Sequence, residues 1–313
     1  MAKELISLFA VFIALFLFGM TVMRAGLTNV IQDTLKEKLL QLTDSPLKGL
    51  LLGTVVTAIL QSSSAVMIMT VGLVAAGYIS FKHSIGIILG SNIGTVVTLE
   101  MIAFDLSSIS LPLLLVGVCL LMIPRQSAFC AGCITFGLAC IFIAMQGLEK
   151  LAYPLASLPF THSFFQLTND SDLVGVGLGT ALSAIIQSST ATTAIAMGFI
   201  NENILALPAG IAIMLGANIG TCFTAFLASI GSNHSARLVA FAHIWLNILG
   251  VLLFLPFIET LSSLSIGLTS IPNLQLAHAS TIFNVICSIL MLPFVHYFAK
   301  FIITLHGKKG VVS

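Results

Sequence analysis

The sequence predicts an all-α polytopic membrane protein, built from two inverted-topology repeats that each contain a re-entrant helical hairpin. Three observations support this fold class: a very apolar composition, an internal repeat, and a polar cluster inside one long apolar run of each repeat. Hydrophobic residues make up 58% of the 313 residues and charged residues 7%, with a mean hydropathy of +1.12. Because soluble domains carry about 25% charged residues, this chain has too few charges to cover a water-facing surface. The net charge of +1 gives no reason to expect a nucleic-acid partner.

The chain begins with an apolar stretch at residues 4–23. We interpret it as a retained membrane span, because it is long for the apolar part of a signal peptide and no convincing cleavage site follows it. The next segment, residues 29–42, looks amphipathic and is expected to lie along the membrane surface. We divide the chain into a first half at 1–150, with the core of repeat 1 at 47–105, and a second half at 151–313, with the core of repeat 2 at 173–258 and a C-terminal span.

An internal repeat organises the chain. Residues 53–98 align without a gap on residues 179–224, at a constant offset of 126, and 18 of the 46 aligned positions are identical. Unrelated segments of this composition would share about five. The polar identities are the informative ones: Gln61/Gln187, Ser62/Ser188, Ser63/Ser189, Asn92/Asn218, Thr95/Thr221 and Thr98/Thr224. A weaker second echo relates Ala242–Pro256 to Ala277–Pro293.

Each repeat contains a mostly apolar run that is too long for one straight span. The runs are Gly49–Ile79 and Gly175–Leu205, each of 31 residues, and their midpoints are Ser64 and Thr190. One helix of this length would extend about 46 Å at 1.5 Å per residue, whereas the hydrocarbon core is about 30 Å thick. Two half-helices that enter and leave on the same side would fit, with the polar residues at a buried turn near the midplane. A strongly tilted or kinked single span is the alternative.

The flanks of the two runs differ in charge. Residues 24–48 carry four basic residues and Lys82 follows the first run, whereas residues 151–172 and 201–208 contain no Lys or Arg. Since basic flanks favour the cytoplasmic side, the two hairpins should open to opposite sides of the membrane. This is the inverted-topology arrangement that many secondary transporters use.

The duplicated motifs predict a central site that is built twice, from QSS and NIGT of each half. Hydroxyl and carbonyl oxygens suit a hard cation such as Na⁺. The amides that follow Ser63 and Ser189, at the start of a half-helix, would face an anion. The candidate residues for binding substrate and Na⁺ are Gln61, Ser62, Ser63, Ser64, Asn92, Thr95, Gln187, Ser188, Ser189, Thr190, Asn218 and Thr221.

Other polar residues carry less information. His243 and His278 are open to two interpretations, a proton or substrate role and a hydrogen-bonded structural role. We interpret Glu100 and Asp105 as interfacial residues, and the six cysteines as small apolar packing residues. An enzyme is not expected, because the sequence has no HExxH or GxSxG motif and no paired carboxylates at helical spacing.

The motifs resemble those of a known family. QSSS from Gln61 and QSST from Gln187, each followed further on by G-[SA]-N-I-G-T, are similar to the type II sodium/phosphate cotransporter family and its bacterial Na/Pi-cotransporter-related proteins. The stretches LFLFGM (15–20) and RLVAFAH (237–243) also resemble that family, and the resemblance covers most of residues 12–295. It implies two inverted repeats, Na⁺-driven transport of inorganic phosphate, and a site at the two QSS tips, residues 61–64 and 187–190.

We therefore expect a sodium-coupled secondary transporter of inorganic phosphate in the cytoplasmic membrane, working by alternating access. Na⁺ is the expected coupling ion, no organic cofactor is expected, and the lipid bilayer is the expected surrounding; a homo-oligomer is left open. Three alternatives also stay open: a transporter of another small anion such as a carboxylate or sulfate, a non-transporting membrane sensor or scaffold, and a channel.

Overall fold

The computed structural model describes residues 2–41, 45–104 and 107–307, apart from the side chains at 30–41, 107 and 159–160. The side chains of most of the predicted amphipathic segment 29–42, and the whole of Asp105, therefore lie outside the described residues. Within the described chain every regular element is helical. Six stretches of it are long and apolar enough to cross a membrane: Ala2–Asn29, Phe81–Ala103, Gln126–Ala156, Leu207–Ser229, His234–Leu268 and Pro272–His306. These observations confirm the predicted all-α class with several apolar spans.

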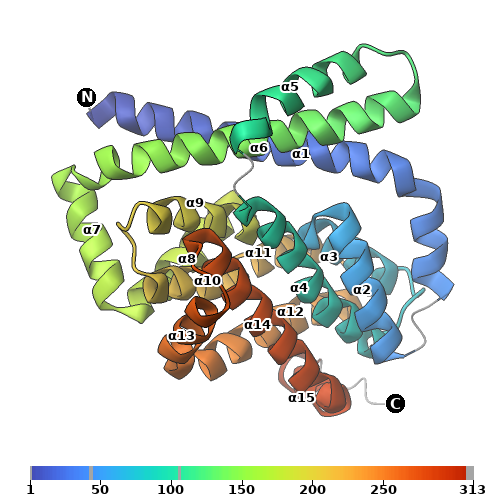
Figure 1. Ribbon diagram of the computed structural model, residues 1–313. Coiled ribbons are helices and arrows are strands. Elements are labelled where there is room, and N and C mark those ends of the chain that lie inside the picture. The colour runs from blue at the N-terminus through green and yellow to red at the C-terminus, as the bar shows by residue number, and fades with distance from the viewer. Residues whose placement is uncertain (1, 42–44, 105–106, 308–313) are drawn as a thin grey trace.

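Two long helices form a layer along one side of the molecule (Figure 1). They are α1 (Ala2–Gln41) and α6 (Gln126–Ala156), which pack against each other, and α5 (Ser107–Leu121) packs on α6. The two helices approach closely because small residues face each other, and a Cβ added to Gly19 would lie only 2.6 Å from the carbonyl oxygen of Gly137. The boundary that the sequence places after residue 150 falls inside α6. A short helix, α7 (Pro159–Asp170), leads from this layer to the second repeat.

The first repeat forms three helices, α2 (Pro46–Leu60), α3 (Ser63–Ala75) and α4 (Phe81–Ala103). Ser45 and Pro46 begin α2, since the Ser45 side chain accepts a hydrogen bond from the Lys48 amide and Pro46 fits the first helical turn. Helix α2 packs lengthwise on α4. The backbones nearly touch at Gly90, where an added Cβ would lie 2.0 Å from the Leu50 carbonyl oxygen.

The second repeat has the same packing. Helices α8 (Asp172–Ile186) and α9 (Ser189–Asn201) correspond to α2 and α3, and α8 packs on α10 (Leu207–Gly220). A Cβ added to Gly216 would lie 2.0 Å from the Val176 carbonyl oxygen. Both members of this pair lie 126 residues after Gly90 and Leu50, so the repeat in the sequence is also a repeat in three-dimensional packing.

The repeats differ at their NIGT motifs. In the first repeat α4 runs without interruption through Asn92 and Thr95. In the second repeat α10 ends at Gly220 and α11 (Cys222–Ser229) begins after Thr221. The second motif therefore interrupts its helix, whereas the first does not.

The C-terminal part confirms the weaker echo in the sequence. Helix α12 (His234–Phe254) leads through a 3₁₀ turn at Leu255–Phe257 into α13 (Ile258–Leu268), and α14 (Pro272–Met291) leads through a 3₁₀ turn at Leu292–Phe294 into α15 (Val295–His306). Both turns read Leu-Pro-Phe. Proline has no amide hydrogen for the helical ladder, so the same residues interrupt both helices in the same way.

The hydrophobic core joins the two halves of the sequence. One cluster of buried side chains combines α2, α3 and α4 with residues of α12 and α15. The other combines α9 and α10 with α1, α6 and α14. Each repeat is therefore buried against helices from the other half of the chain.

Candidate functional site

Each long apolar run is broken at its Gln-Ser pair. Helix α2 ends at Gln61, which has φ 52° and ψ 30°, and α8 ends at Gln187, with φ 58° and ψ 30°. Both residues are left-handed, a conformation that is uncommon for residues other than glycine. The next residue begins a new helix in each case. Ser62 accepts a hydrogen bond from the Ala65 amide and Ser188 from the Ala191 amide, both at 3.2 Å.

The two breaks meet at one small cavity. Its lining combines both Gln-Ser tips with residues of α1, α4 and Thr221, and every residue that lines it has a polar side chain. No aspartate or glutamate is among them. The lining residues are Arg24, Gln61, Ser62, Ser63, Ser64, Thr95, Thr98, Gln187, Ser188, Ser189, Thr190 and Thr221.

Two helix N-termini at the cavity make it favourable for a negatively charged ligand. Helices α3 and α9 both begin at it, and their first residues, Ser63 and Ser189, line it. The first turn of a helix presents amide hydrogens that have no partner within the helix, and it carries a partial positive charge. Two such ends, together with a guanidinium and no carboxylate, make a site suited to a small anion.

Two buried side-chain oxygens at the cavity have no hydrogen-bond partner within the described chain. They are Oε1 of Gln61 and Oγ1 of Thr221, on side chains that are 7% and 6% exposed. Most buried polar atoms in proteins are paired. Unpaired oxygens at this place are suitable ligands for a bound cation or solute.

Ten of the twelve candidate residues from the sequence line this cavity, and the two asparagines of the NIGT motifs do not. The Asn92 amide nitrogen lies 3.4 Å from Oδ1 of Asn247, and the Asn218 amide nitrogen donates to the carbonyl oxygen of Met214 at 3.0 Å. Asn247 also donates to the sulfur of Cys222 at 3.3 Å. The asparagines thus belong to a neighbouring polar cluster between α4, α10 and α12.

Sequence analysis missed two residues of the cavity, Arg24 and Thr98. In the sequence, Arg24 is assigned only to the basic flank of the first run. In the structure its Nε donates a hydrogen bond to the carbonyl oxygen of Gln61 at 2.8 Å. The available signal was a single charge within an apolar stretch, which usually marks a functional position in membrane helices. Thr98 belongs to a polar pair of the repeat, and its counterpart Thr224 lies 3.4 Å from the hydroxyl of Ser64.

Neither of the two histidines lines the cavity. His243 is 1% exposed, and neither ring nitrogen has a hydrogen-bond partner among the described residues. His278 lies with Nδ1 3.0 Å from Oε1 of Glu100, which also accepts a hydrogen bond from Thr281 at 2.6 Å. Glu100 is partly exposed, and its contacts with His278 and Thr281 link α4 to α14.

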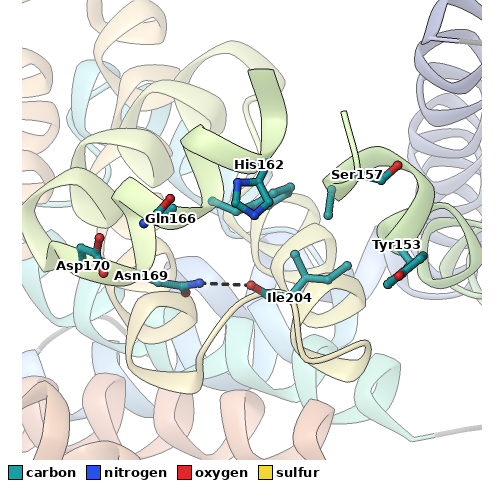
Figure 2. Close-up of a pocket in the computed structure, with 9 residues that line it drawn as sticks. Tyr153, Ser157, His162, Gln166, Asn169, Asp170 and Ile204 are labelled. Atoms are coloured by element: carbon teal, nitrogen blue, oxygen red, sulfur yellow. Dashed lines mark hydrogen bonds between the residues drawn. The ribbon is translucent and has the colours of Figure 1, made fainter. Parts of the chain in front are cut away.

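A second, wider cavity of about 600 Å³ lies between α6, α7 and the connection from α9 to α10. Figure 2 shows His162 and Tyr153 at its edges and the amide of Asn169 directed toward Ile204. Asn169 donates to the Ile204 carbonyl oxygen at 3.1 Å and accepts from the Ala206 amide at 2.9 Å. These two hydrogen bonds of Asn169 hold the connection between α9 and α10 against α7. None of the duplicated polar residues lines this cavity.

Several apolar helices of membrane-spanning length surround a small polar cavity built from two repeats. This is the arrangement of a multi-pass protein of the cell membrane, and the family and relatives that the chain matches are transporters, not enzymes. The family described as Na⁺/Pi-cotransporter matches residues 15–150 and 156–276. The chain belongs to this family.

Individual relatives agree with the family match. The chain is 38% identical over 294 residues to YqeW of Bacillus subtilis, an uncharacterized protein, covering 94% of this chain and 96% of YqeW. It is 27% identical over 291 residues to YjbB of Escherichia coli K12, a putative inorganic phosphate export protein, covering 92% of this chain but only 53% of YjbB. It is 28% identical over 128 residues to human sodium-dependent phosphate transport protein 2B, covering 38% of this chain and 19% of that protein. The comparison with solved structures gave no match.

Proposed function

We propose that this protein transports inorganic phosphate across the cell membrane, coupled to Na⁺, and that phosphate binds at the cavity between the two Gln-Ser tips. The main support is the meeting of two duplicated polar tips, from positions 126 residues apart, at one cavity without a carboxylate. Membership of the Na⁺/Pi-cotransporter family supports the choice of substrate, as do the names of the relatives in Escherichia coli and human, a putative inorganic phosphate export protein and a sodium-dependent phosphate transport protein.

The proposed site binds the anion and the cation with different groups. The starts of α3 and α9, with the hydroxyls of Ser63 and Ser189, would donate hydrogen bonds to phosphate oxygens. Na⁺ would bind to neutral oxygens, among which Oε1 of Gln61 and Oγ1 of Thr221 have no other partner in the described chain. Each ion would strengthen the binding of the other, since their charges are opposite and the site is largely buried.

We propose that the helix pairs α2–α3 and α8–α9 are re-entrant hairpins of opposite orientation. Helices of 13 and 15 residues extend only about 20–22 Å, short of a hydrocarbon core of about 30 Å. The Lys/Arg contrast between the flanks of the two repeats supports opposite orientation. In the proposed cycle the unit that carries both tips moves between two positions and exposes the cavity to each side in turn.

Uptake of labelled phosphate into proteoliposomes tests this function. Saturable uptake that depends on an inward Na⁺ gradient, and that stops when K⁺ replaces Na⁺, is the expected result. Labelled sulfate and a dicarboxylate serve as competing substrates in parallel vesicles. Transport of either in place of phosphate would contradict the substrate, flux without saturation or Na⁺ dependence would indicate a channel, and no flux of any of them would indicate a sensor or scaffold. Loading the vesicles and measuring efflux gives the direction of coupling.

A further inference from the structure

Arg24 is the only charged residue between positions 5 and 29, within the apolar stretch Ala2–Asn29 of α1. A charged side chain inside a membrane-spanning segment is costly, and it commonly faces a partner or a solute pathway. Arg24 is partly buried and lines the cavity that both Gln-Ser tips form. The cost of placing a guanidinium there indicates a partner for it at the cavity.

The protein itself supplies that partner only in part. The Nε group of Arg24 donates to the carbonyl oxygen of Gln61 at 2.8 Å, which fixes the side chain at the first tip. No carboxylate among the described residues lies within ion-pair distance of the Arg24 guanidinium, and none lines the cavity. An arginine has five N–H donors in a planar fork, so four of them remain after the bond to Gln61.

We propose that Arg24 binds the transported anion directly through its terminal nitrogens and gives the site its preference for a doubly charged oxyanion. This inference rests on the proposed function and adds a charged residue of α1 to a site otherwise composed of neutral groups. The guanidinium fork matches two oxygens of a tetrahedral oxyanion. The starts of α3 and α9 approach the same cavity, and the unpaired Oε1 of Gln61 and Oγ1 of Thr221, both more than nine-tenths buried, mark it as a ligand site.

The second repeat has no equivalent of this arrangement in the described chain. The residue 126 positions after Arg24 is Lys150, which is exposed on α6. Gln187 is also exposed, whereas Gln61 is 7% exposed. The site therefore has one guanidinium, supplied from the side of the first tip, and Lys150 offers a matched control for loss of a positive charge.

A purely structural role for Arg24 is the competing explanation. Its bond to the Gln61 carbonyl oxygen lies at the end of α2, where a positive charge stabilises the helix dipole. That role accounts for Nε but not for a guanidinium that lines the cavity without a carboxylate. It also predicts no change in which ionic form of phosphate the protein prefers.

The experiment compares Arg24→Gln, Arg24→Lys and the control Lys150→Gln with the wild type, all as full chains in proteoliposomes. Phosphate half-saturation is measured on both sides of the second ionisation of phosphate, and Na⁺ half-saturation is measured at saturating phosphate. Arg24→Gln should raise phosphate half-saturation by about tenfold or more, because a hydrogen bond to a charged group contributes about 1.5–3 kcal/mol. It should also remove the preference for the dianion. Arg24→Lys should keep that preference, and Lys150→Gln should behave as the wild type.

Each outcome decides the inference. If the wild type transports phosphate and Arg24→Gln keeps its affinity and its preference for the dianion, the inference is wrong while the proposed function stands. If the wild type does not transport phosphate, both fail. Should Arg24→Gln not reach the membrane, Arg24→Lys decides through its phosphate half-saturation: a clear rise in a folded lysine variant supports direct binding by the guanidinium fork, which lysine cannot reproduce, and an unchanged value contradicts the inference.

Discussion

Gln61 and Gln187 hold the same left-handed backbone conformation, with φ 52° and 58°. Such a conformation costs a non-glycine residue about 1–3 kcal/mol, and glycine would adopt it without this cost. Both repeats nevertheless carry glutamine there. This suggests that the side chain is used, and in Gln61 the amide oxygen has no partner within the described chain.

We predict that Gln61→Gly and Gln187→Gly each lower transport by about tenfold or more while leaving a folded protein. Glycine removes the side chain but suits the backbone conformation, so stability should be equal or higher by about 1 kcal/mol. Loss of a direct ligand should lower affinity, since each 1.4 kcal/mol corresponds to a factor of ten. Phosphate and Na⁺ half-saturation in proteoliposomes, with thermal unfolding in detergent, measure the two effects separately.

Thr70→Ala is the control for these variants. Thr70 is 1% exposed, and its hydroxyl donates to the Val66 carbonyl oxygen within α3, away from the cavity. Loss of such a bond in a membrane helix costs about 0.6 kcal/mol on average, so transport should change little. Near-normal kinetics of both glutamine variants, with a loss in Thr70→Ala, would show that the tips are structural and that the transport site lies elsewhere.

The sequence predicted most residues of the candidate site because a local pattern was duplicated. Gln61 and Gln187 lie near the centre of runs that are too long for one span, and their shared polar neighbours identified both tips. The single charge of Arg24 within an apolar stretch was a usable signal, but its contact with Gln61, 37 positions further along the chain, was not predictable from the sequence. The asparagines of the NIGT motifs are part of the repeat, but the repeat alone does not tell which cavity each side chain reaches.

At the scale of helices, the pairs α2–α4 and α8–α10 show how the repeat is built. The helices of each pair approach so closely that backbone meets backbone. Gly90 lies against the carbonyl oxygen of Leu50, and Gly216 lies against the carbonyl oxygen of Val176. The sequence already indicated where each long run would break. It did not indicate the interruption at Thr221, because the first repeat has nearly the same motif within one continuous helix.

We predict that Gly216→Ala destabilises the protein and that Gly177→Ala does not. A Cβ at Gly216 would lie 2.0 Å from the Val176 carbonyl oxygen, so the helices must separate. Overpacking of this kind typically costs about 1–3 kcal/mol, and a rigid backbone contact should place the variant at the upper end. Gly177, on α8 of the same pair, has nothing within 4 Å of an added Cβ. Alanine there should be neutral or stabilising, because it favours the helix.

Thermal unfolding in detergent and the amount of protein in the membrane check this pair of variants. An equal loss of thermal stability in Gly216→Ala and Gly177→Ala would mean that helix propensity or lipid contact dominates. Close packing of α8 on α10 would then not determine stability. Gly90→Ala should reproduce the effect of Gly216→Ala in the first repeat, with Gly72→Ala as its control, since Gly72 also has nothing within 4 Å of an added Cβ.

At the scale of the whole molecule, the second repeat packs against the layer formed by α1 and α6. Helix α9, which begins at the second tip, contacts α6. A Cβ added to Gly198 of α9 would lie 3.6 Å from the Cβ of Leu148 on α6. This contact joins α9, part of the unit that we propose to move, to the layer of α1 and α6, which we take to stay in place.

We predict that a disulfide between these two helices stops transport. The distance of 3.6 Å between Cβ atoms falls within the range that disulfides adopt, about 3.5–4.5 Å. In a background without the native cysteines, the double variant Leu148→Cys and Gly198→Cys should transport phosphate when reduced. Oxidation should abolish uptake, and a reductant should restore it, because alternating access requires the unit that carries the tips to move past α6.

The two single cysteine variants, treated with the same oxidant, control for damage to other groups, and gel mobility after proteolysis between the two positions reports formation of the crosslink. Arrest of the crosslinked protein alone would support movement of α9 relative to α6 during transport. Full transport by a protein that is completely crosslinked would show that α6 and α9 move together. In that case the boundary of the moving unit lies on the far side of α6, and the cavity would be exposed by motion of the first repeat with α12 and α15, the helices with which it shares its own buried cluster.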